Sequence, residues 1–136
     1  MAISNIEASF QCDIQKVWEV VTSLDYYDWR SDLSKIEIIN ENQFIEYTKE
    51  GYATTFTITV KETCKRYEFD MENGNMKGHW IGIFTRDGND TKIDFIEDVT
   101  AKKLLMKPFV KGYLKKQQEL YLSDLKKALS MNGLSQ

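Results

Sequence analysis

The hydrophobic period of this 136-residue chain changes once, and that change limits the folds available to it. Between Lys35 and Thr100, apolar and polar residues alternate in short segments, whereas after Pro108 apolar residues recur every three or four positions. Alternation with a period of two places side chains on the two faces of a β-strand, and the longer period places them along one stripe of an α-helix. The sequence therefore predicts an α+β fold in which an antiparallel sheet precedes one long helix.

Turn signals divide the alternating region into strands. Asn73-Gly74 and Asp87-Gly88 are typical of hairpins, because both dipeptides tolerate a positive φ angle. A further alternating segment near the N-terminus predicts one more strand, which precedes the others. The seven predicted strands span residues 4–12, 35–39, 43–48, 53–61, 66–72, 77–85 and 91–99.

Three helical segments are predicted around this sheet. Asp13 can cap a first helix over residues 14–22, whose apolar residues share one face. A short second turn of helix over residues 25–29 would gain its order only from packing its aromatic side chains. The long helix is expected to start at Pro108, where a missing N–H is tolerated, and to end in a left-handed residue near Gly133.

The alternation also assigns a covered and a solvated face to the sheet. The inward set is predicted to be Thr54, Phe56, Ile58, Val60, Tyr67, Phe69, Met71, Gly78, Trp80, Gly82, Phe84, Ile93, Phe95, Glu97 and Val99. The outward set is Thr55, Thr57, Thr59, Glu68, Asp70, Lys92 and Asp94. The stripe that covers the inward set is Phe109, Tyr113, Leu114, Gln117, Leu120, Tyr121, Leu125, Ala128 and Leu129. Asp124 is assigned to the edge or back of that helix.

Length, charge and motif content exclude several classes of protein. A chain of this length fits one domain over residues 1–136, and a net charge of −3 argues against a nucleic-acid partner. We expect a cytoplasmic protein, because the N-terminus has no basic segment before an apolar run and no stretch suits stable membrane insertion. Cys12 and Cys64 are expected to be reduced thiols. No metal site is expected, and no cofactor is expected because phosphate-binding and dinucleotide-binding motifs are absent.

Two segments carry a resemblance to a known superfamily. Residues 14–22 (IQKVWEVVT) followed by Trp29, and residues 117–129 (QQELYLSDLKKAL), resemble the opening and closing segments of bacterial polyketide cyclase/dehydrase and lipid-transport proteins. That group lies in the Bet v 1-like, or START-like (SRPBCC), helix-grip superfamily. The resemblance implies a curved seven-stranded antiparallel sheet wrapped around a long C-terminal helix, with two short helices after the first strand. It also implies a cavity for lipids, sterols or polyketides, but no single chemistry.

Aromatic side chains are the expected walls of such a cavity. Aromatic residues make up 12% of the chain, and large rigid rings can line a binding site or fill a core. The candidate ligand-binding residues are Phe10, Phe56, Phe69, Trp80, Phe84, Phe95, Phe109, Tyr113 and Tyr121. The competing interpretation of each of them is a solidly packed core without a ligand.

Two carboxylates are the candidate catalytic residues. Glu46 lies between Ile45 and Tyr47, and Glu97 shares the predicted inward face of its strand. A buried carboxylate has a raised pKa and could act as general acid or base, or bind a ligand hydroxyl or amine. An ion pair or a solvated position is the alternative for both. His79, the only histidine, is expected on the outer face as a surface or pairing residue, which disfavours hydrolases that depend on a histidine.

These features leave three hypotheses for function. The first is a non-catalytic carrier of a small hydrophobic molecule or lipid, and the second is a cyclase/dehydratase-like enzyme that uses Glu46 or Glu97. The third is an interaction module that acts through its exposed sheet face. Six lysines near the start of the long helix could make transient contact with a membrane, or could simply be solvated. They are Lys102, Lys103, Lys107, Lys111, Lys115 and Lys116.

Overall fold

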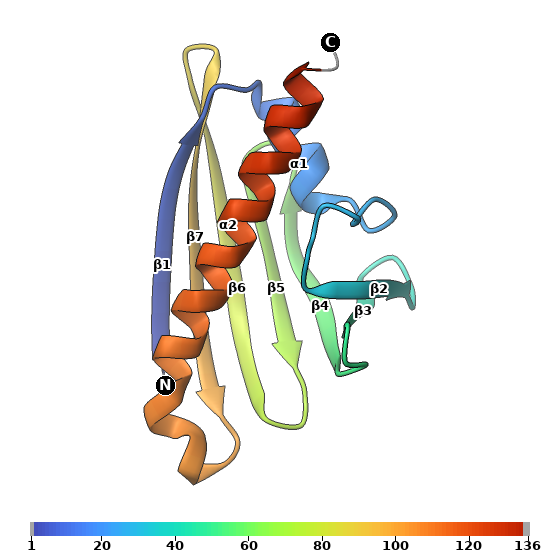
Figure 1. Ribbon diagram of the computed structural model, residues 1–136, viewed down its shortest axis with the longest axis vertical. Helices are drawn as coiled ribbons and strands as arrows, with labels where there is room; N and C mark the ends of the chain where they lie inside the picture. Colours follow the sequence, from blue (N-terminus) through green and yellow to red (C-terminus); the bar gives the residue numbers. More distant parts are fainter. Residues whose placement is uncertain (1, 135–136) are drawn as a thin grey trace.

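A seven-stranded antiparallel sheet and a long C-terminal helix make up the computed structural model, which describes residues 2–134 (Figure 1). The strands are β1 (Ala2–Phe10), β2 (Leu33–Ile38), β3 (Gln43–Thr48), β4 (Ala53–Glu62), β5 (Arg66–Glu72), β6 (Met76–Asp87) and β7 (Asp90–Ala101). The helices are α1 (Ile14–Thr22), the 3-10 helix η1 (Leu104–Phe109) and α2 (Val110–Leu134). The strand order is β1-β7-β6-β5-β4-β3-β2, so β1 and β2 are the edges. The α+β architecture expected from the sequence is confirmed.

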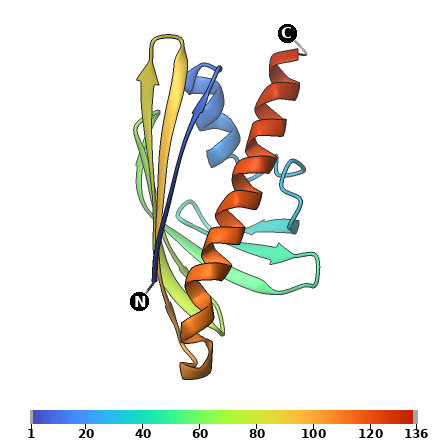
Figure 2. The same cartoon turned by 60° about the vertical axis from the view of Figure 1, so that its left-hand side comes forward.

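The long helix crosses one face of the sheet. In Figure 2, α2 runs along the concave side, while β2, β3 and β4 project beneath it. On the β1 side the helix is fixed by Gln118, whose amide donates to the Ser4 carbonyl oxygen (3.1 Å) and accepts from the Ser4 hydroxyl (2.6 Å). Both residues are buried, so these bonds hold α2 against the edge of the sheet and leave the β2–β4 side farther away.

The predicted faces of the central strands are confirmed. Tyr67, Trp80, Ile93 and Phe95 are all buried beneath the helices, as the alternation required. Gly82 is needed beside them, because a Cβ at this position would lie 2.5 Å from the Trp80 ring. The indole of Trp80 therefore lies over its own strand, in contact with its neighbours on the concave face.

The first strand and first helix are joined by a short capped turn. β1 begins two residues earlier than predicted and ends at Phe10. Thr91 donates its hydroxyl to the Cys12 carbonyl oxygen (2.7 Å), and Asp13 accepts from the Gln15 N–H (3.1 Å) as the predicted N-cap of α1. The cap satisfies an N–H that the first turn of a helix cannot pair internally.

The predicted second short helix is wrong. Within the described chain, residues 23–32 form turns and bends, and α1 is the one helix between β1 and β2. Five residues cannot close a stable helical turn without a packed face, and this segment is ordered instead by contacts with α2. The Trp29 ring packs edge-on against Tyr121, with centroids 5.2 Å apart.

The start and end of the long helix also differ from the prediction. Pro108 lies within η1, and α2 begins at Val110, whose N–H donates to the Lys107 carbonyl oxygen in a 3-10 pattern. Pro108 fits here because its missing N–H and fixed φ suit the tight first turn of a helix. At the other end, α2 continues through Gly133 to Leu134, so the expected left-handed residue does not end it at Gly133.

Candidate functional site

A cavity of about 450 Å³ lies between α2, the segment 23–32 and the concave face of the sheet. Small-molecule sites generally measure about 300–1,000 Å³ and combine apolar walls with a few polar groups. The lining here combines aromatic rings from the sheet, the segment 23–32 and α2 with eight charged side chains. The lining aromatic residues are Tyr27, Trp29, Phe44, Phe56, Tyr67, Phe69, Trp80, Phe95, Tyr113 and Tyr121.

Six of the nine predicted wall residues line the cavity. Phe69 stacks on Trp80 with centroids 4.8 Å apart and planes 5° from parallel, and it meets Phe56 edge-on at 5.1 Å. Phe95 contacts Trp80 at 4.8 Å and Tyr121 at 6.0 Å, which joins the sheet wall to the helix. These contacts fix the rings against one another, so the wall is rigid. The six are Phe56, Phe69, Trp80, Phe95, Tyr113 and Tyr121.

The other three predicted wall residues lie elsewhere. Phe10 and Phe84 are buried in the core that α1 completes, where Trp18 meets Phe84 edge-on at 5.0 Å. Both lie toward the end of the sheet that α1 covers, so helix packing takes the place of a cavity there. Phe109 is the last residue of η1 and is 71% exposed, because the 3-10 turn directs it away from the sheet.

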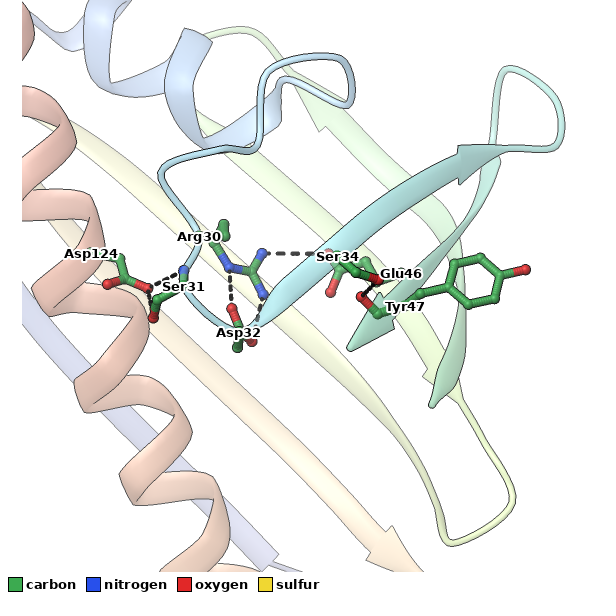
Figure 3. A network of polar contacts seen from close by, with 7 residues as sticks. All are labelled: Arg30, Ser31, Asp32, Ser34, Glu46, Tyr47 and Asp124. Atoms are coloured by element: carbon green, nitrogen blue, oxygen red, sulfur yellow. Dashed lines mark hydrogen bonds and ion pairs between the residues drawn. The ribbon is translucent and has the colours of Figure 1, made fainter. Parts of the chain in front are cut away.

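A buried guanidinium lies at the centre of the polar lining (Figure 3). Arg30 donates from Nε and Nη2 to the two carboxylate oxygens of Asp32, each at 3.2 Å, and from Nη1 to Glu46 Oε2 at 3.5 Å. Its Cζ also lies 4.9 Å from the centroid of the Tyr121 ring. Glu46 is therefore in the ion pair that was the alternative interpretation of this residue.

The segment that carries Arg30 is anchored to α2. The Ser31 N–H and hydroxyl both donate to Asp124 Oδ2, at 2.9 Å and 2.8 Å (Figure 3). Asp124 is buried, whereas the sequence pattern assigned it to the edge or back of the helix. Charge-assisted bonds of this kind are among the stronger ones in proteins, so they set the position of the neighbouring Arg30.

Burial and charge act against each other within this group. Burial alone would lower the pKa of Arg30, but the carboxylates of Glu46 and Asp32 raise it above its usual value. Burial raises the pKa of Glu46, although Arg30 opposes this. Arg30 therefore stays protonated, and its charge is balanced by two acidic neighbours.

Of the two candidate catalytic carboxylates, Glu97 is the one without a partner among the described residues. It lies on β7 between Ser4 of β1 and Trp80 of β6, and its side chain lines the cavity. No residue in the described part of the chain forms a hydrogen bond or ion pair with its carboxyl group. Burial, and to a lesser degree the charge of Glu46, raises the pKa of Glu97 to about 7, although Arg30 lowers it. Near neutral pH this group can both donate and accept a proton.

Three further polar groups belong to residues that line the cavity. Trp29 lines the cavity, and its Nε1 is buried without a hydrogen-bond partner among residues 2–134. Burial also raises the pKa of the Tyr67 and Tyr121 hydroxyls, so both remain O–H donors. A buried donor without a partner is unfavourable, so the Trp29 N–H is a local cost to the fold beside the cavity.

His79 lies on the other face of the sheet, as predicted. Its Nδ1 is 2.6 Å from Asp70 and its Nε2 is 2.7 Å from Glu68, which makes it a pairing residue away from the cavity. Among the residues whose positions are described, no group of three histidine, cysteine or acidic side chains is arranged to hold a metal ion. None of the helices in that part of the chain is long and apolar enough to cross a membrane.

Sequence reasoning missed Arg30 and the residues around it. The available signal was a charged pair, Arg30 and Asp32, directly after Trp29 in an aromatic-rich segment. A charged residue flanked by aromatic residues that must be buried is itself expected to be buried and paired. Glu97, in contrast, was found from strand alternation alone.

Comparison with solved structures identifies the fold. A START superfamily protein from Mycobacterium smegmatis has a TM-score of 0.87 at 11% identity, covering 96% of this chain and 99% of that one. A conserved protein from Geobacillus kaustophilus has a TM-score of 0.81 at 12% identity, covering 95% of each chain. The di-domain ARO/CYC BexL from the BE-7585A biosynthetic pathway has a TM-score of 0.75 at 11% identity, covering 93% of this chain and 46% of that one.

These similarities establish architecture and not activity, because every identity is far below the level at which functions are shared. No protein-family model matches the chain, and no curated protein matches it significantly. The chain has the START-like, or Bet v 1-like, helix-grip fold that its opening and closing segments indicated.

Proposed function

We propose that this helix-grip protein binds a small, largely apolar molecule in its internal cavity and holds a hydroxyl or amine group of that molecule through Glu97. The observation that carries the proposal is the Glu97 carboxyl group, which has no partner among the described residues and lines an aromatic cavity of about 450 Å³. Glu97 lines the cavity, where the aromatic walls limit its hydration, so a ligand group that donates a hydrogen bond to it would bind there favourably.

The cavity lining has more acidic than basic side chains, which favours a ligand that donates a hydrogen bond over an acidic ligand. The basic residues are Arg30, Lys49 and Lys77, and the acidic residues are Asp32, Glu46, Glu50, Glu72 and Glu97. Arg30 already pairs with the carboxylates of Asp32 and Glu46, so its positive charge is balanced before a ligand carboxylate arrives. An acidic ligand would also meet Glu97 in a space where water screens charge poorly. A ligand hydroxyl or ammonium group would instead satisfy Glu97, and the neighbouring rings would attract a cation.

Ligand titration followed by tryptophan fluorescence tests this proposal, because Trp29 and Trp80 both line the cavity. Dodecylamine, dodecanol and dodecanoate share one chain and differ only in the head group, so they are matched probes. At about pH 8, above the pKa of Glu97, we expect saturable binding of the amine and alcohol and at least about tenfold weaker binding of dodecanoate.

The variant Glu97→Gln should reduce amine affinity by about tenfold and leave alcohol affinity little changed, because an amide still accepts a hydrogen bond. Glu68→Gln is the matched control, since Glu68 lies on the other face of the sheet and pairs with His79 there. Equal binding of all three probes would reject the role of Glu97. Saturable binding of none of them would reject the cavity function itself.

A cyclase/dehydratase-like enzyme is the second candidate. The pKa of Glu97, raised to about 7 by burial, suits a general acid or base, and the aromatic walls could hold a reactive chain in a folded shape. Native mass spectrometry of the purified protein would identify a co-purifying molecule to use as substrate. Loss of its turnover in Glu97→Gln with retained binding would support an enzyme, and its release unchanged by the wild-type protein would support a carrier.

A further inference from the structure

Three large apolar side chains project from η1 into solvent. Leu104, Leu105 and Phe109 are 76%, 87% and 71% exposed, and we refer to these three residues as the η1 tip. Single exposed apolar residues are common on proteins, but three on one short turn that protrudes from the molecule are not. The tip lies at the end of the molecule opposite the C-terminus (Figure 1).

The tip is part of an ordered element. The Lys102 N–H donates to the Asn75 carbonyl oxygen (2.7 Å), which ties the start of this segment to the β5–β6 turn. Met106 packs against the small core cluster that includes Val99 and Leu114. One side of η1 is thereby fixed to the body of the protein, and the remaining apolar residues are directed outward.

Positive charge surrounds the tip. Residues 99–118 contain six lysines and no acidic residue, although the whole chain has a net charge of −3. Lys102 pairs with Glu72 (2.7 Å), whereas Lys103, Lys107 and Lys111 form no ion pair with any described residue. An exposed apolar patch within a basic surface complements one kind of partner, an anionic lipid bilayer.

We infer that the η1 tip inserts into the interfacial layer of an anionic membrane while the surrounding lysines contact lipid phosphate groups. Leucine and phenylalanine lose unfavourable contact with water when they enter the acyl boundary. Lysine side chains can place their ammonium groups at the head-group level while their methylene stems remain beside the apolar tip. The segment would lie in the interface and would not cross the bilayer.

A second copy of the chain fits this surface less well. Stable protein interfaces bury roughly 800 Å² on each partner, and three side chains on one turn provide much less. Two such tips facing each other would also bring two groups of lysines together, which opposes association.

Docking in this way would bring the cavity wall close to lipid. Tyr113 and Leu114 follow the tip by about one turn of α2, and both line the cavity. Membrane contact does not depend on what the cavity binds, so it can be tested separately from the proposed ligand.

Co-sedimentation with vesicles tests the inference. We expect the wild-type protein to bind vesicles of phosphatidylcholine containing phosphatidylserine, to bind pure phosphatidylcholine vesicles at least about tenfold more weakly, and to be released by high salt. The triple variant Leu104→Ser, Leu105→Ser, Phe109→Ser should bind anionic vesicles more than about tenfold less well. Its far-ultraviolet circular dichroism should remain that of the wild type, because the three side chains are exposed.

Matched control variants test whether membrane binding depends on the η1 tip and its neighbouring lysines, or on exposed lysines and apolar residues anywhere on the surface. Lys107→Gln with Lys111→Gln should weaken binding by about 25-fold, since each lysine near an anionic surface accounts for about a fivefold effect. Lys126→Gln with Lys127→Gln, exposed on the far part of α2, should have little effect. Ile38→Ser with Ile39→Ser removes comparable exposed apolar residues from β2 and its flank, and should also leave binding unchanged.

Each remaining outcome overturns the inference. Failure to bind anionic vesicles would do so, as would equal losses in the tip and control variants. Self-association that the triple variant abolishes would assign the tip to a second copy of the chain. The triple variant should still bind dodecylamine as the wild type does, so failure of the membrane inference is distinguishable from failure of the cavity function.

Discussion

The two faces of the sheet carry similar ionisable groups in different states. On the outer face, His79 lies between Glu68 and Asp70, and Arg66 also pairs with Glu68. On the concave face, Arg30 is balanced by acidic neighbours, but Glu97 has no partner in the described part of the chain.

The pKa values of two carboxyl groups summarise this difference. Hydrogen bonds from Arg66 and His79 lower the pKa of Glu68, whereas burial raises the pKa of Glu97 to about 7. The outer group is a set of ion pairs in contact with water, and such pairs stabilise a fold only slightly. The inner group keeps a carboxyl without a partner among the described residues and with a raised pKa, which is typical of a functional site.

Replacing one arginine on each face gives the largest expected contrast. Arg30→Met should lower the free energy of unfolding by about 3 kcal/mol, because it leaves the carboxylates of Asp32 and Glu46, whose side chains are only 25% and 17% exposed, without a counter-charge. Arg66→Met should cost less than about 1 kcal/mol, because its pair is partly exposed. Urea unfolding of both variants measures the contrast, and similar losses would show that the two faces are energetically alike.

Removing the charge of Glu97 should raise the free energy of unfolding, whereas Arg30→Met lowers it, and the change should be smaller. A carboxyl group whose pKa is raised by folding contributes stability below its unfolded value, near 4.5, and loses it as the pH rises through about 7. Glu97→Gln should therefore unfold with a free energy about 2–3 kcal/mol higher than the wild type at about pH 8, and with little difference below about pH 4.5. Urea titrations across this range measure it, and a gain that does not depend on pH would contradict the assignment.

The smallest expected effect belongs to His79. Burial lowers its pKa, but hydrogen bonds and charges from Glu68 and Asp70 raise it above the usual 6.5 overall. The protonated ring therefore stabilises the fold fully below about pH 6.5, and this stability is lost as the pH rises through the higher folded-state pKa. Because these groups are partly exposed, His79→Gln should cost less than about 1 kcal/mol at about pH 5.5 and still less at about pH 9.

The central sheet was predictable because its signals are local. Glycine turns such as Gly88, which has a φ of +63°, define where strands end, and alternation then assigns their faces. The same alternation placed Glu97 in the cavity. Helix boundaries were less predictable, because Pro108 is compatible both with the first turn of an α-helix and with the 3-10 turn that it occupies.

The other half of the site depends on contacts that local patterns do not encode. Arg30 meets Glu46 from 16 residues away, and Ser31 meets Asp124 from 93 residues away. The helical period placed Asp124 correctly on α2 but could not show that a distant turn would bury it. Phe109 was assigned to the wrong environment for a related reason, because a change from α to 3-10 geometry alters the direction of each side chain.

The bonds between Ser31 and Asp124 have a mechanical consequence. They attach the turn that carries Arg30 to α2, so any displacement of α2 would displace Arg30 as well. If α2 moved away from the sheet to let a ligand enter, Arg30 would lose its contact with Glu46 on β3. Ligand entry by this route would precede ligand recognition, because the ion pair of Arg30 with Glu46 would re-form only after α2 returned to the sheet.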